Sequence, residues 1–173
     1  MILEKTLRLP TADSFFGDFG ETKEFVNKLI NAVRRLDYKD CKSRTGCYLT
    51  FYDRRTETLY SKYYGPEPLE GEIKKSKYLQ CSTEKVTRMV RYHLNTSFER
   101  INEDNEQYGG GVSFNNFLFI GCSGYAPEID EAISFIIGLW AINRIYKTRI
   151  SPKQMEETKN RFVPQLIDLM MAA

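Results

Sequence analysis

Histidine occurs once in the 173 residues, at position 93. An imidazole can ligate a metal ion or haem iron, and His93 stands near the predicted end of a helix. A phenolate of Tyr92 or Tyr108 could serve as such a ligand instead. The alternative is a histidine that forms a hydrogen bond at the helix C-terminus, where positive charge is favoured. A single histidine rules out a His-rich metal centre and leaves one candidate for imidazole chemistry.

A run of three glycines, Gly109 to Gly111, directly follows Tyr108. Consecutive glycines let backbone N–H groups approach an anionic or planar ligand, which would make this loop a binding site. Glycines also satisfy positive φ angles and close packing where a chain enters a strand. The sequence has no G-x-x-x-x-G-K-[ST] motif, so a loop that binds a nucleoside triphosphate is not expected.

Three carboxylates, Glu128, Asp130 and Glu131, follow Pro127. They could form a general-base cluster or a cation site that faces the glycine run. Their position also suits the first turn of a helix that begins at the proline, because carboxylates are stabilised at the positive end of the helix dipole. Catalysis by this cluster with a metal ion therefore stays open beside a structural role.

The four cysteines show no C-x-x-C spacing, which indicates reduced thiols rather than disulfides or a zinc site. Cys122 could act as a nucleophile if His93 came within hydrogen-bond reach, and a buried thiol is the alternative. A basic run is predicted on the exposed side of one helix, where it forms a solvated face or holds a phosphate-bearing ligand or an acidic partner. It comprises Lys74, Lys75, Lys77, Lys85, Arg88 and Arg91.

Composition limits the class of protein. Apolar residues make up 42% and charged residues 28%, so the chain can bury a core. Lys and Arg total 25 against 23 Asp and Glu, a net charge of +2 that gives no general case for nucleic-acid binding. The apolar uncharged stretch over 132–143 is 12 residues long, short of the about 20 that cross a bilayer. The N-terminus has no secretory pattern. We expect a cytoplasmic protein that contacts neither membrane nor nucleic acid.

The elements that must position these residues follow from periodicity. Apolar residues at i, i+3 and i+4 predict a helix from Glu21. Alternation predicts a hairpin with strands Cys47–Asp53 and Thr58–Tyr64. The next predicted helix runs from Glu72 to about Leu94, with an interruption near Cys81-Ser82-Thr83 and with His93 on its apolar face.

A second hairpin is predicted around Asn115-Asn116, since asparagine tolerates positive φ. Helices are then predicted from Pro127 and from Ser151, the last with a kink at Pro164. Helices and antiparallel hairpins in this order predict an α+β fold. We divide the chain into an N-terminal arm (1–20), one domain (21–150) and a C-terminal helix (151–173).

The segment from Tyr108 to Leu139 combines a glycine run, a strand end and an acidic helix start, which are Gly109-Gly110-Gly111, Ile120-Gly121-Cys122-Ser123-Gly124 and Asp130-Glu131-Ala132. In these features it resembles the haem-binding/haem-degrading GlcG/HbpS-like family. The resemblance implies a profilin-like fold, in which helices flank an antiparallel sheet, here with an extra C-terminal helix. It also implies homo-oligomers and a ligand pocket, whose lining would comprise Tyr108, Gly109, Gly110, Gly111, Asp130, Glu131 and His93.

We therefore expect a non-enzymatic module that binds or senses a small ligand and forms homo-oligomers. Haem or another tetrapyrrole is the ligand that the resemblance implies. One alternative is an oligomeric scaffold or adaptor that acts through contacts with a protein partner. The other is a metal-assisted enzyme that uses the acidic helix start.

Overall fold

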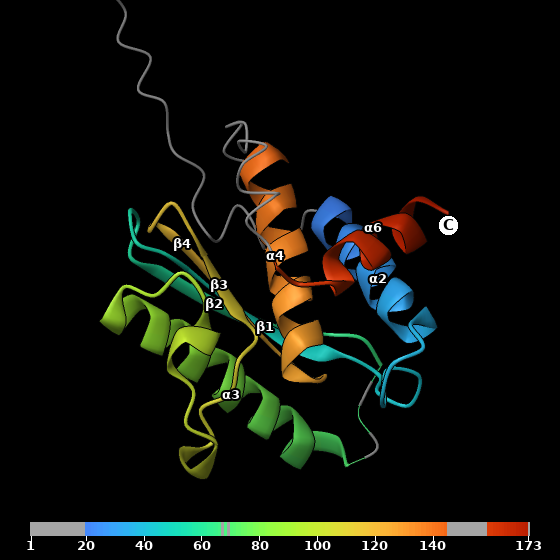
Figure 1. Ribbon diagram of the computed structural model, residues 1–173, viewed down its shortest axis with the longest axis horizontal. Coiled ribbons are helices and arrows are strands. Elements are labelled where there is room, and N and C mark those ends of the chain that lie inside the picture. The colour runs from blue at the N-terminus through green and yellow to red at the C-terminus, as the bar shows by residue number, and fades with distance from the viewer. Residues whose placement is uncertain (1–19, 67, 69, 145–158, 173) are drawn as a thin grey trace, which may run out of the picture.

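A four-stranded antiparallel sheet forms the centre of the computed structural model, which describes residues 20–66, 68, 70–144 and 159–172 (Figure 1). The strands are β1 (Cys47–Asp53), β2 (Thr58–Tyr64), β3 (Gly111–Phe114) and β4 (Leu118–Ser123). Their order is β2-β1-β4-β3, so two hairpins are joined through the β1–β4 pair. The predicted arm and the predicted helix start at Ser151 lie outside the described residues.

Both predicted hairpins are confirmed. The strands β1 and β2 match their predicted bounds residue for residue, because aromatic and β-branched side chains pack well on a pleated, partly buried sheet. The second hairpin turns at Asn115 and Asn116, with φ of 48° and 55°. Asparagine tolerates this left-handed conformation, which explains why the pair sits at the turn.

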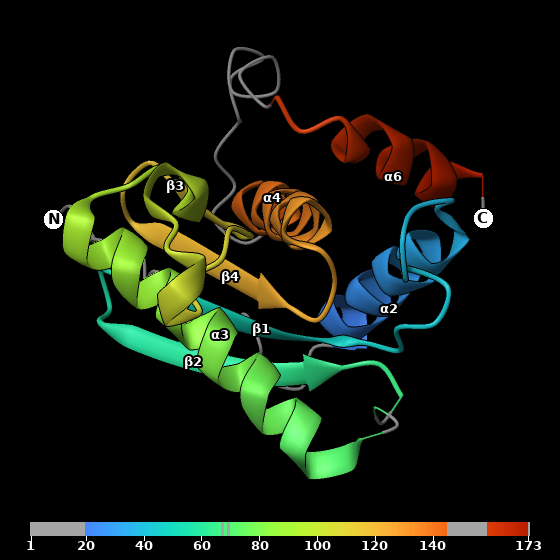
Figure 2. The ribbon, with the colours of Figure 1, turned by 60° about the horizontal axis from the view of Figure 1, so that its bottom comes forward.

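Helices cover both faces of the sheet (Figure 2). Helix α3 (Gly71–Tyr92) lies on one face, where the Ser82 hydroxyl is 2.8 Å from that of Thr50 on β1. Helices α2 (Gly20–Arg35) and α4 (Pro127–Arg144) pack on the other face, against Leu49, Phe51 and Ile120. Helix α6 (Phe162–Met171) packs against α2 and α4. The predicted α+β class, with helices flanking an antiparallel sheet and an extra C-terminal helix, is confirmed.

Three predictions about α3 were wrong. The helix is continuous through Cys81, Ser82 and Thr83, where an interruption was expected. Lys85 and Arg88, assigned to the exposed side, are 2% and 3% exposed because acceptors from elsewhere in the chain surround them. His93 is exposed rather than on the apolar face, and it ends the helix in a left-handed conformation with φ of 54°.

The predicted kink at Pro164 is also wrong. Helix α6 begins at Phe162, so the proline occupies the first turn, where a helix needs no N–H from it. In the part of the chain that the structure describes, no helix is both long and apolar enough to cross a membrane.

Candidate functional site

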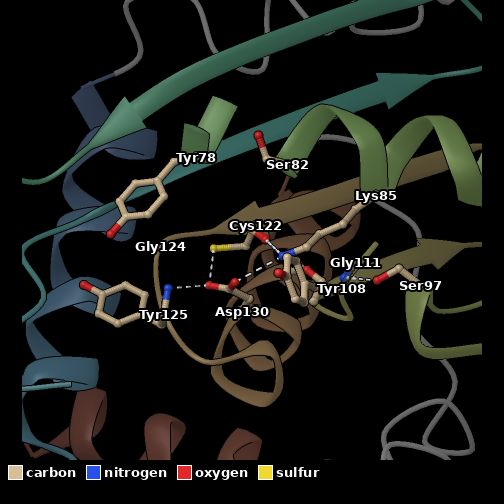
Figure 3. Close-up of polar contacts among 12 residues, drawn as sticks. Tyr78, Ser82, Lys85, Ser97, Tyr108, Gly111, Cys122, Gly124, Tyr125 and Asp130 are labelled. Atoms are coloured by element: carbon tan, nitrogen blue, oxygen red, sulfur yellow. Dashed lines mark hydrogen bonds and ion pairs between the residues drawn. The ribbon is translucent and has the colours of Figure 1, made fainter. Parts of the chain in front are cut away.

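A buried ion pair lies behind the glycine run (Figure 3). The Nζ atom of Lys85, on α3, donates to Oδ2 of Asp130, on α4, over 3.1 Å and to the carbonyl of Cys122, on β4, over 2.5 Å. The two charged side chains are only 2% and 3% exposed. This contact therefore joins both helix layers to the sheet between them.

The second oxygen of the Asp130 carboxylate is also occupied. Its Oδ1 accepts a hydrogen bond of 2.9 Å from the Tyr125 N–H, and the Cys122 thiol lies 3.5 Å away. Burial raises the pKa of Asp130, while the Lys85 ammonium and the Tyr125 N–H act in the opposite direction. With a cation and an N–H already bound, Asp130 serves as an anchor in the interior.

The glycine run packs tightly against this anchor. Gly110 has φ of +115°, and its carbonyl accepts from the Cys122 N–H over 3.1 Å and from the Ser134 hydroxyl over 2.9 Å. A Cβ at Gly109 would stand 2.4 Å from the Phe98 ring, and the Gly111 N–H donates to the Ser97 hydroxyl over 2.8 Å. Positive φ and close packing account for these glycines, and a ligand-binding role for them stays a prediction.

Tyr108 is held through its backbone. The buried guanidinium of Arg88 donates to the Tyr108 carbonyl over 2.5 Å and to the carbonyl of Arg100. It also pairs with Glu84 at 3.2 Å. Arg88 thereby fixes both ends of the segment from 100 to 108 on α3, a role that no local sequence pattern indicates.

Glu131, by contrast, lines a cavity of about 620 Å³ beside strand β3. Its Oε2 accepts from the Thr96 hydroxyl over 2.8 Å, and its Oε1 accepts from the Asn160 amide over 3.2 Å. The other residues that line the cavity include Val112, Phe114, Asn115, Asn116 and Phe135. Among the described residues, the cavity thus offers apolar surface with one carboxylate, the cation of Lys159 and several polar groups, and neither Asp130 nor the glycine run lines it.

The sequence analysis named Glu131 as a candidate but did not name its neighbours in the cavity. Phe135 lies one helical turn further along α4, a spacing that places both side chains on one face. Thr96 begins a capping box with Glu99, and that pattern was visible in the sequence. Asn160 lies 29 residues from Glu131 and gave no signal.

The pKa of Glu131 is raised above 4.5, chiefly because the carboxyl is buried. Between 4.5 and the raised pKa, the native state holds a proton that the unfolded chain has lost, so the free energy of unfolding falls as pH rises through this window. Glu131→Gln removes this contribution. We expect the urea midpoint of the wild type to fall more than that of the variant as the pH rises above about 4.5. Parallel falls in the two proteins would contradict this assignment.

His93 and Tyr92 lie at the C-terminal end of α3 and are not among the residues that line this cavity, although Asn95, two residues after His93, lines it. The Arg100 guanidinium lies 3.7 Å from the centre of the Tyr92 ring. Haem ligation by His93, Tyr92 or Tyr108 stays a prediction.

All four cysteines are buried and reduced. Burial raises the pKa of the Cys122 thiol well above its ordinary value, which disfavours the thiolate that nucleophilic catalysis needs. Among the described residues, no group of three or more His, Cys, Asp or Glu side chains is arranged to hold a metal ion.

Comparison with known proteins found a similar solved structure but no similar sequence. Neither a family model nor a curated protein matches the sequence. The structure is similar to protein ORFY of Klebsiella pneumoniae, a protein of DUF336, the GlcG-like family. The two share 15% sequence identity and a TM-score of 0.41, over 66% of this chain and 86% of ORFY. Similarity at this low identity and TM-score does not indicate a ligand or a partner.

Proposed function

We propose that this protein is a non-enzymatic module that binds a small molecule in the Glu131 cavity. The observation that carries the proposal is the position of Glu131 beside the aromatic ring of Phe135 in a cavity of about 620 Å³. Ligand sites are typically concave and apolar with a few placed polar groups. The matching ligand has an apolar body for Val112, Phe114 and Phe135 and a donor or cationic group for Glu131.

Binding is favoured over catalysis by the partners of Glu131. General acid–base chemistry needs a second group whose environment separates the two pKa values. Glu131 instead receives hydrogen bonds from a hydroxyl and a carboxamide, Thr96 and Asn160, neither of which titrates in the working range. Asp130, the neighbouring carboxylate, is engaged by Lys85.

The proposal is tested with 2-phenylethylamine and 3-phenylpropionate, which share an aromatic body and carry opposite charges. We expect the amine to shift the NMR signals of residues around the cavity and to bind at least about tenfold more weakly to Glu131→Gln, because a charged hydrogen-bonded contact is lost. Phe135→Ala should weaken the amine too. Glu24→Gln, which changes an exposed carboxylate on α2 outside the cavity lining, is the matched control.

Equal binding of amine and acid, or equal loss in Glu131→Gln and Glu24→Gln, would contradict the proposal. Haem is titrated separately, with the Soret band as readout and His93→Ala alongside. A saturable shift that the variant loses would identify His93 as the ligand to iron. Homo-oligomers and a cytoplasmic location stay part of the proposal, and the solution mass tests the first.

A further inference from the structure

A second hollow, of about 540 Å³, lies between α2 and the end of β2. The side chains of interest along its length are those of Lys23, Asn27, Asn31, Arg34, Lys62 and Tyr63. The four from α2 are spaced at i, i+4, i+8 and i+11, which places them on one stripe of the helix. This hollow shares no residue with the Glu131 cavity.

The described charged side chains that line this hollow are all basic. Among the described residues, Lys23, Arg34 and Lys62 line it, and no Asp or Glu does. Some exposed cations elsewhere in the described chain pair with acidic side chains, as in the Lys42–Asp37 and Lys77–Glu106 pairs, and others such as Lys28 do not. Across residues 20–66, 68, 70–144 and 159–172, none of the three cations in the hollow forms an ion pair. In a chain with 25 basic and 23 acidic residues, three uncompensated cations in one depression form a local site for negative charge.

The length of the hollow and its two asparagines favour an extended acidic peptide over a polyphosphate. Helices rise about 1.5 Å per residue, so the backbones of Lys23 and Arg34 are about 16 Å apart along α2. Asn27 and Asn31 lie between these two cations. A carboxamide both donates and accepts, which matches the peptide N–H and C=O groups, whereas a polyphosphate offers only acceptors.

We propose that this hollow binds an extended acidic peptide segment of a partner protein. Extended chain advances about 3.3 Å per residue, so carboxylates five residues apart reach the cations at the two ends of the stripe. The two asparagines then hydrogen-bond to the peptide backbone between them. Lys62, on β2, adds positive charge along the opposite wall.

The test uses fluorescence anisotropy at low ionic strength with a labelled peptide, Glu-Gly-Ser-Gly-Ser-Glu, in which the carboxylates are five residues apart. We expect saturable binding that Lys23→Glu and Arg34→Glu each weaken about tenfold, since each substitution replaces attraction by repulsion. Asn31→Ala should weaken it about threefold. Lys28→Glu is the matched control, because Lys28 is an exposed cation of α2 that does not line this hollow. All four positions are exposed, so the variants should keep the wild-type urea midpoint.

Three results would overturn the proposal. Equal weakening by Lys23→Glu and Lys28→Glu would show attraction to a diffuse positive surface. Equal affinity for Gly-Ser-Glu-Glu-Gly-Ser, whose carboxylates are adjacent, would exclude the extended geometry. Tighter binding of inorganic tripolyphosphate, with displacement of the peptide, would assign the hollow to phosphate instead.

Discussion

Lys85→Met is expected to lower the free energy of unfolding by about 3–5 kcal/mol. The substitution keeps most of the unbranched side chain, which becomes one atom shorter, but removes the cation that Asp130 and the Cys122 carbonyl share. The Asp130 side chain is 3% exposed, so water cannot take over as donor. Removing one partner of a buried ion pair leaves the other charge buried without compensation. This lowers the free energy of unfolding by far more than the intact pair contributes to it.

Two further variants separate this effect from simple loss of a lysine. Lys77→Met removes the exposed Lys77–Glu106 pair, whose side chains are 55% and 53% exposed, and should change stability by less than about 1 kcal/mol. Adding Asp130→Asn to Lys85→Met should restore part of the loss, because the amide oxygen still accepts from the Tyr125 N–H and carries no charge. Urea unfolding measures all of them. Similar losses in Lys85→Met and Lys77→Met would contradict the role of the buried pair.

Gly110→Ala is expected to cost about 3–5 kcal/mol, the sum of backbone strain and a steric collision. The residue has φ of +115°, which L side chains rarely adopt. A Cβ there would stand 2.6 Å from the Asp130 Cβ and 2.8 Å from the Lys85 Nζ. In the Gly110→Ala variant, either the Lys85–Asp130 pair or the glycine run must therefore move from its native position.

Gly71→Ala provides the matched control, since Gly71 also has positive φ, at +60°, but no atom lies within 4 Å of its Cβ position. Strain alone should cost about 1–2 kcal/mol there. The difference between the two variants in urea unfolding measures the collision behind the glycine run. If both variants lose the same free energy, close packing at Gly110 is not the reason for the glycine.

The sheet was predictable because its signals are local. Strands β1 and β2 alternate along seven residues each, and the Asn115-Asn116 turn lies between short apolar runs. The face of α2 that packs on the sheet was visible for the same reason, as its apolar residues recur at helical spacing. Each of these signals depends on neighbours within one element.

The site was not predictable in the same way. Lys85 was placed on an exposed face because a lysine is almost never fully buried without a partner, and its partner Asp130 lies 45 residues away. Arg88 binds backbone carbonyls, which every residue carries and which no pattern identifies. The acidic helix start was singled out from the sequence, but only the fold shows that Asp130 faces inward to Lys85 and that Glu131 lines the cavity.

The strand order has a consequence for how the chain folds. Each hairpin closes over a few residues, but the central β1–β4 pair brings Tyr48 beside Ser123, 75 positions later in the chain. The entropy of closing so long a loop must be lost before the contacts across it compensate, and such topologies fold slowly. During synthesis, strand β1 therefore lacks its partner β4 until β4 has left the ribosome, and the apolar faces of β1 and β2 stay uncovered for that time.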